Sequence, residues 1–153
     1  MSARYNLIPL SEMWRPLPEL CEWLEGMGLV IPDDWQDSRN PTATEVRSVV
    51  RELADENQLS VETDFHAAGD DLDAVLITEN DSTFLSVADY TKDGDDHAPR
   101  RISFQYGDPD LVVPICERLA SLCGPFLLTN NGAFFVIVTA GTPPDAEWAA
   151  DKF

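Results

Sequence analysis

The chain has 153 residues, of which 28 are acidic and 10 basic, and its formal net charge is −18. This length is typical of one domain, and a hydrophobic fraction of 44% is sufficient for a core. An acidic excess of this size repels nucleic acid and anionic membranes and attracts basic surfaces. We therefore expect a partner that is neither nucleic acid nor membrane.

The acidic residues are concentrated in the middle of the chain, because residues 33–99 hold 18 acidic side chains and 4 basic ones. The three cysteines (Cys21, Cys116 and Cys123) have no paired spacing, which argues against a disulfide framework and favours buried, reduced thiols. The chain opens with no signal-peptide pattern, and its apolar runs are too short to cross a membrane. These features predict a soluble cytoplasmic protein.

The first part of the chain predicts one strand and two helices. Residues 5–10 suit a short strand, and residues 11–28 carry apolar side chains on one stripe, as an amphipathic helix does. A loop follows. Thr42 and Glu45 have the spacing of a capping box, which predicts the start of a helix over residues 42–57 with Val46 turned inward.

Four strands are expected next, over residues 59–65, 72–78, 83–90 and 101–106. Leu59, Val61, Thr63 and Phe65 alternate with polar residues, which predicts one buried face for the first of these strands. Residues 72–78 are nearly all apolar, which predicts a central strand that is covered on both faces. A turn at residues 79–82 pairs the second strand with the third.

The closing unit, residues 101–138, is predicted to run strand, helix, strand, strand. Pro109 suits a first helical position, Gly124-Pro125 ends the helix, and Asn131-Gly132 suits a hairpin turn. Leu122 belongs to the predicted inward stripe, and Pro114 would kink the helix or delay its start.

The element order predicts an α+β fold: a single-layer, mostly antiparallel or mixed sheet of about five to seven strands with three helices. Residues 1–138 form the predicted domain, and residues 139–153 a C-terminal tail that is either docked or frayed.

The sequence contains no recognisable catalytic or cofactor motif. His66 and His97 are the two histidines, and neither has a spacing that would pair it with a cysteine or form a zinc site. The acidic runs beginning at Asp70 and Asp93 lack the remaining ligands of a calcium loop, so solvated turns are the simpler interpretation. The doublet Arg100-Arg101 is interpreted as a strand-edge feature. We expect no enzyme, no cofactor and no metal.

Three acidic clusters are the candidate partner-binding residues. Trp35 is either an aromatic anchor within the first cluster or a cover over the two helices, and both interpretations stay open. The clusters are Asp33, Asp34, Trp35 and Asp37; Asp70, Asp71 and Asp73; and Asp93, Asp95 and Asp96.

In its closing unit and its acidic excess, the chain resembles bacterial immunity proteins as a broad class. The resemblance covers residues 101–138 and carries no shared motif, so it assigns no residue a role. It implies a bacterial protein that neutralises a basic partner, a toxin domain, by occlusion. Two alternatives stand beside it: a small enzyme or ligand-binding domain without a motif, and a structural subunit that forms a homodimer through an exposed strand edge.

Overall fold

The computed structural model describes residues 4–13, 32–106, 109–129 and 135–140, together with Glu19, Glu22, Glu25 and Gly26. Within these residues the helices are α1 (Leu10–Met13), α3 (Ala43–Asp55) and α4 (Pro109–Cys123), with short 3-10 turns η1 (Trp35–Asp37) and η2 (Tyr90–Lys92). The strands are β1 (Arg4–Pro9), β2 (Ser60–Ala68), β3 (Asp71–Ile77), β4 (Ser82–Val87), β5 (Ile102–Gln105), β6 (Phe126–Thr129) and β7 (Phe135–Val138).

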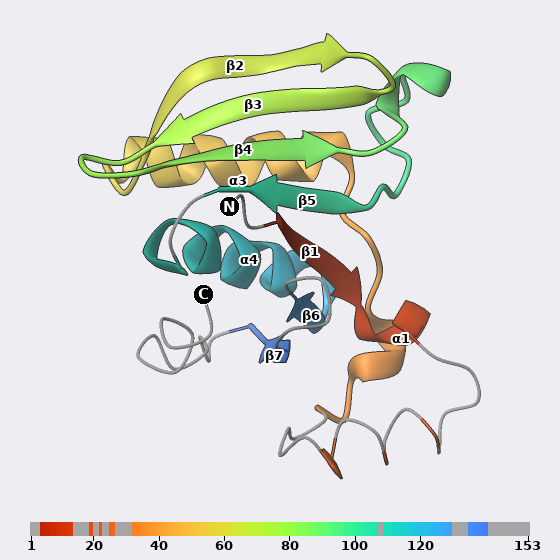
Figure 1. Ribbon diagram of the computed structural model, residues 1–153. Coiled ribbons are helices and arrows are strands. Elements are labelled where there is room, and N and C mark those ends of the chain that lie inside the picture. The colour runs from red at the N-terminus through yellow and green to blue at the C-terminus, as the bar shows by residue number, and fades with distance from the viewer. Residues whose placement is uncertain are drawn as a thin grey trace.

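The strands form one antiparallel sheet of seven in the order β2-β3-β4-β5-β1-β6-β7 (Figure 1). The predicted α+β class, sheet and closing strand–helix–strand–strand unit are confirmed. The first strand, β1, lies between β5 and β6, so two strands of the closing unit pair with the first strand of the chain.

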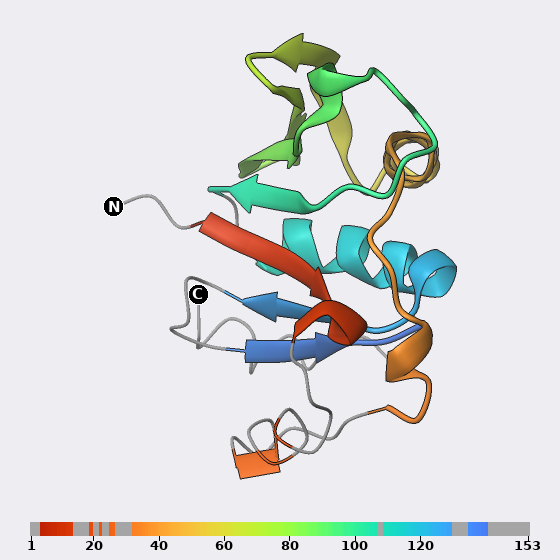
Figure 2. The same cartoon turned by 90° about the vertical axis from the view of Figure 1, so that its right-hand side faces the viewer.

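Both long helices lie on the same side of the sheet (Figure 2). Their buried side chains meet alternate side chains of the strands in one hydrophobic core. Fully buried members of this core are Leu7, Leu76, Leu85, Ile102 and Phe104 from the strands, and Val46, Leu53, Ile115 and Leu119 from the helices. The opposite face of the sheet is thereby left without these two helices.

Helix α3 begins as predicted. The Thr42 hydroxyl accepts a hydrogen bond from the Glu45 N–H at 3.2 Å, and Glu45 Oε1 accepts one from the Thr42 N–H at 3.0 Å. This reciprocal pair satisfies two donors that a helix start leaves free. Val46, Val49 and Leu53 then follow on the buried face.

Helix α4 also begins at the predicted Pro109, and Pro114 lies inside it without delaying its start. Leu122 was expected to face inward, but it is 50% exposed, because the buried face continues through Ala120 and Cys123 instead. Cys116 and Cys123 are free and buried, as predicted.

The prediction of one buried face for the strand at residues 59–65 was correct only at its ends, where Leu59 is buried and Phe65 packs against the core. β2 is an edge strand, and most of its side chains are exposed, Val61 among them with 38% of its surface. β3 is second from that edge, so Val75 and Ile77 on its outer face are only half-buried rather than covered. A period of two predicts a strand, but it does not place that strand within a sheet.

Several expectations fall outside the described residues: most of the helix at residues 11–28 with Cys21, the turn at residues 130–132, and the tail beyond residue 140. Among the helices that the structure describes, each is too short or too polar to span a membrane.

Candidate functional site

Two of the three acidic clusters meet at one end of the sheet. The N–H of Thr91, in η2, donates to the carbonyl oxygen of Asp70 at 3.1 Å, and its hydroxyl donates to that of Gly69 at 3.1 Å. The Asp89 N–H donates to Asp71 Oδ1 at 3.1 Å. These contacts join the β2–β3 turn to the β4–β5 connection. We name the resulting surface the acidic corner; its carboxylates are Asp70, Asp71, Asp89, Asp93, Asp95 and Asp96.

The buried side chain of Arg100 fixes the loop of the acidic corner through several hydrogen bonds. Arg100 is only 7% exposed, and its guanidinium donates to the carbonyl oxygens of Asp89 at 2.7 Å and Asp95 at 3.2 Å, and to the Asp93 carboxylate. Its charge also lies 5.5 Å from the centre of the Tyr90 ring. The two arginines of the doublet therefore differ. Arg101 is exposed next to β5, whereas the buried Arg100 holds the loop in place.

Two carboxylates of the corner, those of Asp93 and Asp96, are held in their ionised form by their neighbours. The pKa of Asp93 is lowered by the Asp95 N–H and by Arg100. The pKa of Asp96 is lowered by the Tyr90 hydroxyl, which donates to it at 2.6 Å, and by Arg47. The Asp93 side chain nevertheless remains 58% exposed. The corner thus presents fixed negative charge to solvent at neutral pH.

The third cluster forms a separate surface. Asp33, Asp34 and Asp37 are exposed and Trp35 is half-buried in η1. Ser38 Oγ fixes this turn, since it donates to the Trp35 carbonyl oxygen at 2.7 Å and accepts from the Ser11 N–H at 2.9 Å. Figures 1 and 2 place η1 beside α1 and far from η2. The half-burial of Trp35 agrees with both interpretations of its role.

Asp73 differs from its cluster. It is 8% exposed, whereas Asp70 is exposed and Asp71 is half-buried, so it adds little to the charge that the corner presents.

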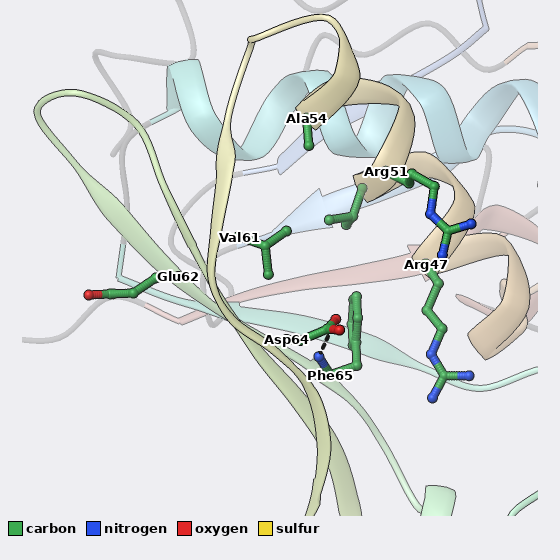
Figure 3. A pocket seen from close by; sticks show the side chains of 8 residues that line it. Arg47, Arg51, Ala54, Val61, Glu62, Asp64 and Phe65 are labelled. Carbon is green, nitrogen blue, oxygen red and sulfur yellow. Dashed lines mark hydrogen bonds between the residues drawn. The ribbon is translucent and has the colours of Figure 1, made fainter.

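A groove of about 670 Å³ runs between α3 and the edge strand β2 (Figure 3). Val50, Ala54, Val61 and Phe65 give it apolar walls, and it carries charges of both signs. Arg47 is bound to Asp96 at 3.1 Å, while Arg51 has no ion-pair partner among the described residues. Sequence analysis missed this groove, because it depends on β2 being an edge strand.

The described residues show no arrangement for nucleophilic or metal chemistry. His66 and His97 are exposed, whereas both described thiols are buried. Burial and Glu45 raise the pKa of the Cys123 thiol to about 12, and burial raises that of Cys116 further. Neither thiol is an activated nucleophile at neutral pH. The same residues contain no group of three or more His, Cys, Asp or Glu placed to hold a metal ion.

Comparisons of the chain with models of protein families, with curated proteins and with solved structures yield no match.

Proposed function

We propose that this protein binds a basic protein partner and neutralises it by occlusion, without catalysis of its own. One observation carries the proposal: the acidic corner brings two separate acidic segments together over a buried arginine. The specific form that we favour is a bacterial, cytoplasmic immunity protein whose partner is a toxin domain.

The geometry suits fast and selective binding. The loop backbone is already held by Arg100 and by the contacts with β3, so little ordering remains to oppose association. Exposed carboxylates of one sign steer a basic surface toward the corner and raise the association rate. A basic surface covered in this way is no longer available to nucleic acid.

The first experiment is a pull-down from the native cell with this protein as bait, washed at low salt and then at high salt. We expect one basic protein in near-equal amount, partly lost at high salt, because exposed charge pairs are screened beyond about 8 Å at physiological salt. Recovery of no partner at either salt would remove the proposal.

Charge reversals then identify the interface. Asp70→Lys changes an exposed residue of the corner, Asp34→Lys changes the cluster at η1, and Asp55→Lys makes the same change on an exposed position of α3. We expect Asp70→Lys to weaken binding by about 1 kcal/mol, roughly fivefold in Kd, and the other two variants to have smaller effects. Equal binding by all three would contradict a role for the corner.

The groove between α3 and β2 supports a second candidate, a small-ligand domain. Its volume lies within the range of ligand sites, and the unpaired Arg51 would suit an anionic group. A metabolite that binds wild type, but not Arg51→Ala, would favour this alternative.

A further inference from the structure

A row of polar side chains crosses the face of the sheet opposite α3 and α4. Leu72 and Ala74 belong to the core beneath the helices, so Asp73 between them points to the other face. Strand pairing places His66 and Ser86 directly opposite Asp73, one on each side. The register then continues the row across the sheet through Ser103, Asn6 and Thr129.

Asp73 is the unusual member of this row. It is 92% buried, and its Oδ1 is closed to solvent and has no hydrogen-bond partner among the residues that the structure describes. The described residues provide no ion pair for this carboxylate. A buried carboxylate without a partner is strongly unfavourable, and such a group in a folded protein calls for a specific explanation. The other acidic side chains of the cluster are exposed or half-buried.

We propose that Asp73, together with His66 and Ser86, binds an organic cation, either an alkylammonium or a guanidinium. The carboxylate supplies the charge, and the Ser86 hydroxyl and a His66 ring nitrogen are further acceptors. Directly opposed side chains lie about 5 Å apart across an antiparallel pair, so a cationic group bound to Asp73 has His66 on one side and Ser86 on the other.

The ligand chemistry follows from the acceptors. An ammonium has three donors and no acceptor, which matches a carboxylate with one further acceptor on each side of it. An anion is excluded by the buried carboxylate. A transition metal is poorly served, because the site has one carboxylate and one imidazole where such metals take three or four protein ligands. His66 is exposed, and its Nδ1 lies 3.1 Å from the carbonyl oxygen of Asp64. A carbonyl oxygen only accepts, so Nδ1 is the donor and Nε2 is the ring nitrogen left to accept from the ligand.

The cation has two sources: a free amine, or a Lys or Arg side chain of a bound protein. The second source rests on the proposed function, and it would place an anchor residue of the basic partner on the sheet face opposite α3 and α4, next to the acidic corner.

The test is a titration of the intact chain with n-butylammonium and with n-butylguanidinium, followed through the backbone amide signals of His66, Asp73 and Ser86. We expect saturable shifts in wild type and at least a tenfold weaker affinity in Asp73→Asn. Asp55→Asn makes the same charge change at an exposed position of α3, outside the acidic corner, and should alter the affinity less than twofold. Equal shifts in Asp73→Asn, or shifts in wild type that do not saturate, would overturn the site.

A second pair of variants keeps the test decisive if Asp73→Asn does not fold. Ser86→Ala removes the hydroxyl beside Asp73, and Ser103→Ala makes the same change one strand further along the row. We expect a three- to tenfold loss of affinity in the first and none in the second; equal effects would contradict the proposed contacts.

With the partner in hand, Asp73→Asn also separates the two sources. Weaker partner binding assigns the cation to a protein side chain, and unchanged binding assigns it to a free amine. If no basic partner exists, the proposed function fails, while the amine titration still decides the site.

Discussion

The Glu45 carboxylate links the start of α3 to the end of α4 through Arg39. It accepts two hydrogen bonds from the Arg39 guanidinium, at 2.7 and 2.8 Å, and one from the Thr42 N–H at 3.0 Å. Arg39 in turn donates to the carbonyl oxygens of Leu122 and Cys123 at the end of α4. The spacing of Thr42 and Glu45 predicted the cap, but the pair with Arg39 depends on a loop whose course no local pattern indicates.

These contacts make stability depend on the ionisation of Glu45. The Arg39 guanidinium and the Thr42 N–H lower the pKa of Glu45 to about 2, from about 4.3 in an unfolded chain. A lowered pKa in the folded state stabilises the protein above the unfolded value, and this contribution is lost as the pH falls toward the folded value. We expect the excess melting temperature of wild type over Glu45→Gln to be largest near pH 6 and smaller by pH 3.

Thermal melts of both proteins across this range make the measurement. Glu62→Gln, at an exposed position of β2, is the control, because the Glu62 carboxylate has no hydrogen bond or ion pair among the described residues. A difference between wild type and Glu45→Gln that stays constant from pH 6 to pH 3 would contradict the ionic role.

At the scale of elements, the end of α4 is pressed against the segment that leads to α3. Gly124 follows α4 with φ of 90°, and a Cβ at that position would lie 2.9 Å from Ser38 Cα. Two requirements therefore coincide at this glycine: a left-handed backbone and the close approach of another backbone. The sequence indicates the first requirement, since Gly-Pro commonly ends a helix, but not the second.

Gly124→Ala should therefore destabilise the fold more than a positive φ alone explains. We expect a loss of about 3 kcal/mol, since the backbone at Ser38 has to move. Gly69→Ala is the matched control, because Gly69 has φ of 61° and open space around a Cβ, and we expect a loss of about 1 kcal/mol there. Denaturant unfolding measures both; equal losses would show that the contact with Ser38 does not matter.

The helices and strands themselves were largely predictable from the sequence, but the order of the strands in the sheet was not. Alternation and helical spacing identified the described strands and the two long helices, because these patterns depend on residues close in sequence. The placement of β2 at an edge, and hence the exposure of Val61 and the groove beside α3, follows from pairing across the whole sheet. The same holds for the polar row, which only the register brings together.

At the scale of the whole molecule, composition predicted an acidic surface but not its distribution. The Asp70 and Asp93 clusters meet because the β2–β3 turn and the β4–β5 connection reach the same end of the sheet, while the cluster at η1 lies elsewhere. Separate runs of acidic residues look alike in a sequence, so the acidic corner could not be distinguished from them before the strand order was known.

The net charge of −18 also predicts how the folded state responds to salt. Repulsion among excess carboxylates acts over distances that salt screens, and it opposes the compact state. Ion pairs act in the other direction, but pairs as exposed as Lys92 with Asp89, at 68% and 62%, contribute little. Because acidic residues outnumber basic ones by 28 to 10, we expect repulsion to dominate.

The melting temperature should rise by about 3 °C or more between about 10 mM and 500 mM NaCl, the shift that 1 kcal/mol gives in a domain of this size. Potassium chloride should act equally, as screening requires, and a fall in melting temperature would mean that the ion pairs outweigh the repulsion.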